Sequence, residues 1–385
     1  KKYKLLSTVF AEATPIEGLT IRSQLGVDYS HTTGFGVSYP SYAPNQGQGA
    51  ASRSTTDGYN LTITNTINYR FDIGLDHSFN FMLGHEGIDN HYEAFSVMTE
   101  GQNNDRLTNI SAGTRATSWD DTTDSDYGFL SFFARGEYNL KNKYFFEAAT
   151  RADGSSRFGK ARRWAMFWSV GFMWDMRNED FMDSASHWLT TAQISASTGT
   201  SGNSSIPNYE HMALVGGGLD YVGNAGVGLM QPGNENLGWE KPWTTNLAFH
   251  AGFWNRLNVD LELYYKQTTD MLMEVPAPYS TTGYGYYWDN VGTMVNMGAE
   301  INVNANLVTA KNFSWSINAN VSYNYNEITE LYNGVKEYER SSTNTKLVVG
   351  HSLGEFFINR YAGVNPANGD ALWYDKEGNI TNVLR

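Results

Sequence analysis

Apolar and polar residues alternate strictly between residues 295 and 307 of this chain. Every odd position there is apolar, and every even position is Asn, Gly or Glu. The same alternation returns between residues 313 and 325, where Ser and Asn fill the even positions. A period of two residues is the pattern of a β-strand with one apolar face. The two stretches therefore predict a hairpin of two strands, with its turn at residues 309–312.

Less regular versions of this pattern recur through the rest of the chain. We predict further strands at residues 19–29, 61–71, 128–140, 144–152, 189–198, 245–253 and 257–265. Most are roughly twice as long as the ~5 to 6 residues usual in soluble proteins, and this length suits a tilted crossing of a bilayer. The polar face of a soluble sandwich would carry Lys, Glu and Arg, whereas here it carries mainly Asn, Ser, Thr and Gly. The pattern favours an all-β fold, a transmembrane antiparallel β-barrel.

The predicted connections alternate between short and long. Tight turns are expected at residues 15–18, 72–76, 141–143, 255–256 and 309–312. Long segments are expected at residues 31–58, 87–126, 199–242 and 267–293, and after residue 327. Outer-membrane barrels have short periplasmic turns and long extracellular loops, so we expect the long segments to face outward. The spacing predicts about twelve strands before residue 327 and two more after it.

The composition agrees with a membrane barrel and argues against several other classes of protein. Aromatic residues make up 14% of the chain and charged residues 17%, below the ~25% charged residues of soluble domains. The longest strongly apolar stretch, residues 164–174, is too short for a membrane-spanning helix. The absence of cysteine excludes disulfide bonds and a cysteine nucleophile. A net charge of −13 argues against nucleic acid as a partner.

The two ends of the sequence predict a partial domain. Residues 1–8 include basic residues but lack the long apolar core and cleavage site of a leader, so we expect mature sequence. Nothing near the start resembles a plug, and residues 382–385 lack the terminal aromatic residue of a last barrel strand. We therefore expect residues 1–385 to form one partial outer-membrane β-barrel domain with long extracellular loops.

Residues 151–159, with the sequence RADGSSRFG, begin a run of recognisable motifs. The later motifs are Arg163-Trp164, Gly202-Asn203, Asn236-Leu237 with Trp239-Glu240, Asn290-Val291-Gly292, and residues 361–366 (YAGVNP). In this order they resemble the SusC/RagA family of TonB-dependent outer-membrane transporters over nearly the whole chain. Two positions depart from the family pattern, because Trp168 stands in place of proline and Thr198 in place of tyrosine.

The resemblance implies properties that the residues alone do not show. It implies a barrel of about 22 strands around an amino-terminal plug, located in the bacterial outer membrane and energised by TonB through a region absent from this sequence. It also implies a SusD-like surface lipoprotein as a lid, and import of oligosaccharides or other large nutrients. A peptide importer of the same family and a structural or adhesive barrel are alternative interpretations. The expected environment is outer-membrane lipid, and no cofactor is implied.

One expected outer loop, residues 279–290, is crowded with aromatic residues that could stack on sugar rings. We predict contact with substrate or lid for Tyr279, Tyr284, Tyr286, Tyr287, Trp288, Asp289 and, from the preceding loop, Trp239. Packing of the loop on itself and membership of an interfacial aromatic girdle are the alternatives. The girdle is the preferred interpretation for Trp164, Trp168 and Trp174.

No residue pattern indicates a metal site or catalysis. Asp120, Asp121, Asp124 and Asp126 could gather a hard cation, but their spacing is not an EF-hand and we interpret them as a solvated acidic loop. The glycines at 216–218 and 223–228 do not lead from a strand into a helix, so we interpret them as loop residues and not as a phosphate cradle. Searches for Gly-x-Ser-x-Gly and His-Glu-x-x-His find neither motif. We therefore do not expect an enzyme.

Overall fold

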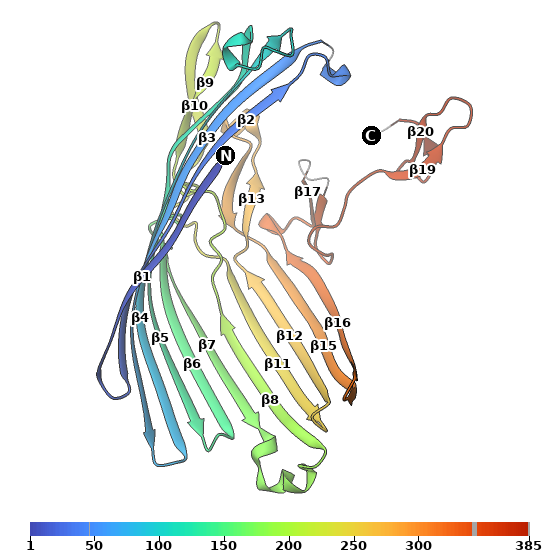
Figure 1. Cartoon of the computed structure of the whole chain (residues 1–385). Helices are drawn as coiled ribbons and strands as arrows, with labels where there is room; N and C mark the ends of the chain where they lie inside the picture. Colours follow the sequence, from blue (N-terminus) through green and yellow to red (C-terminus); the bar gives the residue numbers. More distant parts are fainter. Residues whose placement is uncertain (46, 341–344, 384–385) are drawn as a thin grey trace.

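The main body of the protein is one strongly curved antiparallel sheet of 12 strands (Figure 1). The computed structural model describes residues 1–45, 47–340 and 345–383. The strands of the sheet lie side by side in the order in which they occur in the chain. β1 and β16 form the two edges, and within the described ranges they pair only on one side.

The strands of the sheet are β1 (Lys2–Ile16), β2 (Leu19–Ser38), β3 (Gly49–Ile73), β4 (His77–Gln102), β5 (Arg115–Leu140), β6 (Tyr144–Ser155), β7 (Trp164–Asp175), β8 (Leu189–Thr200), β11 (Lys241–Phe253), β12 (Leu257–Thr269), β15 (Thr293–Ala310) and β16 (Phe313–Glu330). This confirms the antiparallel sheet predicted from the alternation. The two additional strands predicted after residue 327 do not join the sheet, because that segment instead forms small separate units.

Small strands lie outside the sheet. They are the hairpins β9 (Leu214–Tyr221) with β10 (Asn224–Gln231), β13 (Leu272–Pro276) with β14 (Tyr286–Asn290) and β17 (Glu337–Arg340) with β18 (Thr345–Val348), and the three-stranded unit β19 (Arg360–Val364), β20 (Ala371–Tyr374) and β21 (Ile380–Thr381). The helices are η1 (Ala43–Asn45), η2 (Ile110–Ala112), η3 (Met176–Asn178), η4 (Asp180–Ala185), η5 (Tyr332–Gly334) and α1 (Tyr279–Thr282). Among the described residues, no helix has the length and apolarity needed to cross a membrane.

The strand register gives the sheet one apolar face and one polar face. One row of directly paired residues, from β3 to β16, is Phe71, Phe79, Tyr138, Phe146, Phe172, Ala196, Leu247, Leu263, Ala299 and Tyr323. The adjacent row is Arg70, Asn80, Glu137, Glu147, Gly171, Ser197, Asn246, Tyr264, Gly298 and Asn324. A shift of one residue in any strand would exchange the two faces, so the apolar pattern sets the register.

Aromatic side chains pack against one another along the apolar face. The ring centroids of Phe79 and Tyr138 lie 4.7 Å apart, and those of Phe146 and Phe172 lie 5.0 Å apart. Even so, many large apolar side chains remain exposed on this face, including Ile301 (43%) and Val321 (69%). A sheet that leaves an apolar face exposed over so many strands is suited to lipid and not to water.

Two expected loops are wrong in extent. Most of the predicted loop segments 31–58 and 87–126 belong to β2, β3, β4 and β5, which continue far beyond the predicted strands. The lateral pairing persists through this extension, for example between Thr55 and Phe95. The alternation is lost there although the pairing persists, which is expected where water wets both faces of a sheet.

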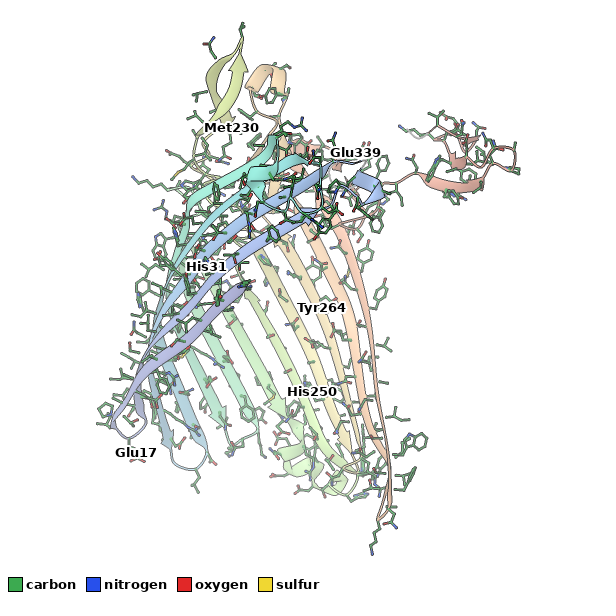
Figure 2. All side chains as sticks on the ribbon, turned by 45° about the horizontal axis from the view of Figure 1, so that its top comes forward. Glu17, His31, Met230, His250, Tyr264 and Glu339 are labelled. Carbon is green, nitrogen blue, oxygen red and sulfur yellow. The ribbon has the colours of Figure 1, made fainter. Side chains whose placement is uncertain are left out.

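The two ends of the sheet differ, and we name them for their connections. The turn end carries short turns, including the one at Glu17, and the loop end carries the hairpin β9–β10, whose Met230 lies far from Glu17 (Figure 2). His250 and Tyr264 belong to the polar face between these ends (Figure 2). The connections thus have the asymmetry that the sequence predicted.

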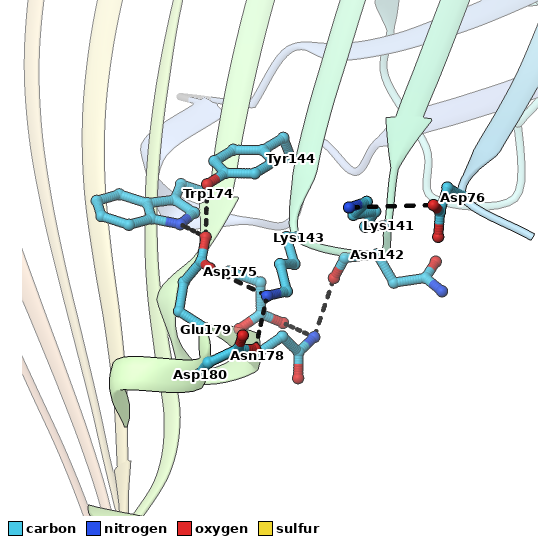
Figure 3. A network of polar contacts seen from close by, with 10 residues as sticks. All are labelled: Asp76, Lys141, Asn142, Lys143, Tyr144, Trp174, Asp175, Asn178, Glu179 and Asp180. Atoms are coloured by element: carbon cyan, nitrogen blue, oxygen red, sulfur yellow. Dashed lines mark hydrogen bonds and ion pairs between the residues drawn. The ribbon is translucent and has the colours of Figure 1, made fainter. Parts of the chain in front are cut away.

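The longest connection at the turn end, between β7 and β8, is held by the carboxylate of Glu179 (Figure 3). This carboxylate accepts hydrogen bonds from Tyr144 Oη at 2.5 Å, Lys143 Nζ at 3.0 Å and Trp174 Nε1 at 3.1 Å. Asn178 Nδ2 adds a bond of 2.9 Å to the carbonyl of Asn142. Helices η3 and η4 are therefore tied to the neighbouring turn between β5 and β6.

Replacing Ile301 with arginine should destabilise the folded sheet by about 2 to 4 kcal/mol, because the charge would enter the apolar face that meets lipid. Asn304 lies three residues away on the opposite, polar face of the same strand. Asn304→Arg is therefore the matched control and should cost far less. Urea unfolding in lipid vesicles measures both variants, and equal losses would contradict the assignment of the faces.

Replacing Glu179 with alanine should release η3 and η4 and raise amide exchange across residues 176–188, because three donors lose one acceptor. The hydrogen bonds from Tyr144 and Lys143 hold the pKa of Glu179 below its ordinary value. This stabilisation is therefore present above the ordinary pKa of a glutamate and is lost as the pH falls through the lowered folded-state pKa. Asp183→Ala, at an exposed carboxylate in η4, is the control. The same exchange in both variants would contradict the role of Glu179.

Candidate functional site

Residues of several recognised motifs converge on one buried cluster at the loop end. Phe158 and Leu237 are fully buried, and Phe167, Ile206 and Trp239 are nearly so. The ring centroid of Trp239 lies 5.0 Å from the ring centroid of Phe158 and 5.6 Å from that of Phe167. Its Nε1 donates to the carbonyl oxygen of Arg163 at 3.0 Å. This cluster, which we call the mouth core, joins the β6–β7 connection to the segment before β11.

Gly159 explains why the β6–β7 connection can come so close to its neighbour. Its amide donates to the carbonyl of Leu237 at 2.9 Å. A Cβ atom at this position would lie 2.1 Å from the carbonyl oxygen of Glu235 and 2.4 Å from its carbonyl carbon. Backbone cannot yield as a flexible side chain can, so only glycine fits without moving one of the two segments.

A second cluster lies on the other side of hairpin β13–β14. Its buried residues are Met271, Met273, Ile328, Leu331 and Leu347. Leu272 and Trp288 of the hairpin pack instead against the mouth core. The hairpin is therefore held between two apolar clusters, one on each side.

Polar contacts fix the same hairpin to the segment before β11. Asn290 Oδ1 accepts from the amide of Gly238 at 2.6 Å, and its Nδ2 donates to the carbonyl of Gly238 at 2.8 Å and to that of Asp270 at 3.0 Å. Asn234 Nδ2 donates to the carbonyl of Trp288 and to Asp289 Oδ1, each at 3.1 Å. We call these two asparagines the hairpin clamp.

The predicted recognition residues are brought together only in part. Trp239 is 7% exposed inside the mouth core, and its ring faces protein in this conformation. Tyr284, Tyr287 and Trp288 are half-buried, and Tyr279 (66%) and Tyr286 (49%) are the exposed aromatic residues of this loop. Contact of these residues with substrate or lid stays a prediction.

Three acidic residues, Asp289, Glu274 and Glu210, lie in the hairpin or beside it. Asp289 Oδ1 accepts from Asn234 Nδ2 and from the amide of Asn290, so this carboxylate already has partners within the protein. Burial raises the pKa of Glu210, and nearby Glu274 raises it further. Burial also raises the pKa of Tyr286, beside Glu274 and Glu210. At neutral pH Tyr286 is therefore an uncharged phenol able to donate a hydrogen bond.

The polar face of the sheet contains a hollow with a volume of about 740 Å³. Its lining includes Asn80, Glu137, Glu147, Asn246, His250 and Glu262. His250 Nδ1 lies 2.9 Å from Asp260 Oδ1. The amides and carboxylates of this lining can hydrogen-bond water or polar solutes, and apolar residues such as Phe145 and Met173 lie beside them.

The acidic segment considered as a cation site, residues 120–126, belongs to strand β5 and not to a loop. The side chains of Asp120, Asp121 and Asp124 lie outside the described residues. Asp126 is described, and its carboxylate lies 2.7 Å from His91 Nδ1. Among the described residues, no group of three or more His, Asp or Glu side chains is arranged to hold a metal ion. The glycine segments expected in a loop belong instead to hairpin β9–β10, with residues 216–218 in β9 and residues 224–228 in β10.

Sequence reasoning did not assign a role to Asn234. Its partners, Trp288 and Asp289, lie more than fifty residues away in the chain, and no local pattern marks such a contact. Asn290 belongs to one of the motifs, but its sequence position does not show that it bridges Gly238 and Asp270. The motif residues Phe158, Leu237 and Trp239 are likewise packing residues of the mouth core.

Replacing Gly159 with alanine should destabilise the mouth core by about 1 to 3 kcal/mol, the usual cost of overpacking. The control is Gly217→Ala, since a Cβ at Gly217 would meet nothing within 4 Å. Thermal unfolding followed by tryptophan fluorescence measures the difference. A Gly159→Ala protein as stable as the control would contradict the close approach to Glu235.

A family model described as "TonB dependent receptor-like, beta-barrel" matches residues 8–381. The TonB-dependent receptor SusC of Bacteroides thetaiotaomicron is 29% identical over 387 aligned positions, which cover 94% of this chain and 38% of SusC. The TonB-dependent receptor P26 of Formosa agariphila is 30% identical, over 93% of this chain and 37% of that protein. The chain thus spans less than two fifths of the length of these relatives.

A solved structure of the RagAB peptide transporter superposes on the whole chain with a TM-score of 0.83 and 31% identity, and the match covers 43% of that chain. The siderophore receptor PiuA from Acinetobacter baumannii, at 12% identity and a TM-score of 0.58, shares the fold alone. The family model, the one-sided sheet and these similarities lead to one conclusion: the chain belongs to the TonB-dependent receptor β-barrel family, in its SusC/RagA group, and is an outer-membrane protein.

Proposed function

We propose that this chain forms part of the wall and mouth of a TonB-dependent importer that carries oligosaccharides or other large nutrients across the bacterial outer membrane. The observation that carries the proposal is the one-sided sheet of 12 strands in a chain matched by the receptor family model over residues 8–381. An apolar outer face and a polar inner face are what a polar solute needs to pass through lipid.

The proposal includes a larger barrel than the sheet described here. The edge strands β1 and β16 each carry backbone groups without a strand partner on their outer side within the described ranges. Unpaired backbone groups cost several kcal/mol each in lipid, so we propose that further strands close the barrel. Residues 1–385 would then be one part of that barrel domain, around a plug that receives energy from TonB.

A SusD-like surface lipoprotein is the proposed partner at the loop end. RagAB and SusC support this part of the proposal, because they belong to the same group of receptors. The surface that meets cargo or lid would include Tyr279 and Tyr286, whose rings are exposed near the tip of β13–β14. Stacking by such rings suits an uncharged sugar, since it requires no ion pair. The proposal makes the protein a transporter and gives it no catalytic role.

Peptides are the second candidate cargo, and one observation favours them. The RagAB structure is that of a peptide transporter, and it matches this chain along its whole length at 31% identity. The acidic surroundings of Tyr286, with Glu210 and Glu274 nearby, would favour a peptide with basic residues over an acidic one.

Uptake by cells tests the proposed function directly. Cells carrying the complete gene should accumulate members of a labelled neutral oligosaccharide library or of a tryptic peptide library, and should lose this uptake when the gene or TonB is disrupted. The class of probe that enters decides between glycan and peptide. Uptake of neither class by cells with a folded receptor would contradict import and would favour a structural or adhesive barrel.

Replacing Tyr279 and Tyr286 together with alanine should weaken binding of the imported class of probe by about tenfold, from the loss of two stacking or hydrogen-bonding rings. Tyr42→Ala removes an equally exposed tyrosine at the loop end and serves as the control. Calorimetry on the purified receptor gives the affinities, and heat-modifiable gel migration confirms folding. Unchanged affinity in the folded double variant would remove these rings from the recognition surface.

A further inference from the structure

We propose that Asn290 and Asn234 are positioning residues for the recognition surface, because together they hold hairpin β13–β14 at the mouth. The identity of what is recognised rests on the proposed function above, whereas the positioning itself does not. Neither side chain would need to touch cargo. Each would act through the hairpin. Its strand β14 carries Trp288 and Tyr286, and the connection between its two strands carries Tyr279.

The hairpin needs such a device because its own pairing is small. β13 and β14 have five residues each and pair only with one another. An isolated two-stranded hairpin is marginally stable at best in water. Its connection from β13 to β14 contains the single helical turn α1 and Gly283, which has a φ of +82°. Tertiary contacts must therefore determine where the tip lies.

Asn290 supplies the first of these contacts at the base of the hairpin. Its side chain uses the acceptor oxygen and both amide hydrogens, in bonds of 2.6, 2.8 and 3.0 Å. Its partners come from two segments, because Gly238 precedes β11 and Asp270 follows β12. An amide engaged at three points has one orientation, so it fixes the base of β14 relative to two strands of the sheet.

Asn234 supplies the second contact, at the two residues of β14 that precede Asn290. Its Nδ2 bonds the carbonyl of Trp288 and the carboxylate of Asp289, while its Oδ1 accepts from the amide of Asn236 at 3.1 Å. Glu240 adds a third tie, since its Oε2 accepts from the amide of Leu272 at 3.1 Å. Ties to both strands prevent the hairpin from rotating about a single point.

This geometry gives Asp289 a structural role within the protein. Its carboxylate receives Asn234 Nδ2 at 3.1 Å and the amide of Asn290 at 2.9 Å. Asp289 is thus the acceptor between the two clamp residues. The exposed rings of Tyr279 and Tyr286 are then the groups that the clamp presents to solvent.

The test compares Asn290→Ala and Asn234→Ala with Asn236→Ala in the complete receptor. Asn236 is the matched control because it lies in the same segment with an exposed side chain that makes no hydrogen bond to the described residues. Amide hydrogen exchange across residues 272–290 should rise by about tenfold in the two clamp variants and stay unchanged in the control. Exchange in β12 and β15 should not change. Asn290→Asp, which keeps the acceptor and loses the donors, should fall between Asn290→Ala and the natural residue.

Binding of the SusD-like lipoprotein is the second measurement. A loss of packing alone, without displacement of the hairpin, should leave this binding unchanged. Clamp variants with intact sheets should bind the lipoprotein about tenfold more weakly than Asn236→Ala does. Unchanged exchange in the hairpin would overturn the clamp, and unchanged association in a variant with a loosened hairpin would overturn its role in recognition. If the natural receptor itself does not bind the lipoprotein, the proposed lid fails, and the exchange data alone then decide whether the clamp holds the hairpin.

Discussion

Backbone hydrogen bonding within a bilayer is the constraint on which this structure depends. Lipid offers no donors or acceptors, so each strand must bond fully to its neighbours. Antiparallel pairing of 12 strands in chain order meets this demand across the sheet. The same pairing lines up residues such as Leu261 and Ile301 on one face and Glu262 and Glu300 on the other. Lipid exposure of one face and a polar lining of the other are thus two results of one register.

The loop end depends on that sheet in a second way. The connections after β6, β8 and β12 lie side by side at the loop end, because these strands are close together in the sheet. Water replaces lipid there, so a small protein core can form. Phe158, Leu237 and Trp239 form that core, and Asn290 ties it to the hairpin above. The motifs that mark the family are therefore largely the residues that assemble the mouth.

The sequence predicted the strands of the sheet in the part that faces the bilayer, because lipid on one face requires apolar residues at every second position. Alternation from residue 295 to residue 307 predicted β15, which spans Thr293–Ala310. Alternation did not predict the parts of β3 and β4 nearest the loop end, residues 49–58 and 87–102. A strand with water on both faces does not need to alternate apolar and polar residues. The burial of Trp239 could not be predicted for a different reason. The sequence shows that a tryptophan lies in an outer loop, but not whether its side chain is buried or exposed. The contact between Asn234 and Asp289 depends on the finished fold, and a single sequence carries no sign of it.

Lipid accessibility along β15 tests the central claim that the sheet separates membrane from lumen. Residues 1–385 contain no cysteine, so single cysteines at residues 299–305 of the complete receptor can carry spin labels without a competing thiol from this region. In vesicles, collision with oxygen dissolved in lipid should be high at positions 299, 301, 303 and 305 and low at positions 300, 302 and 304. Collision with a water-soluble nickel complex should show the opposite alternation. Accessibility without a period of two residues, or with its phase reversed, would contradict the account.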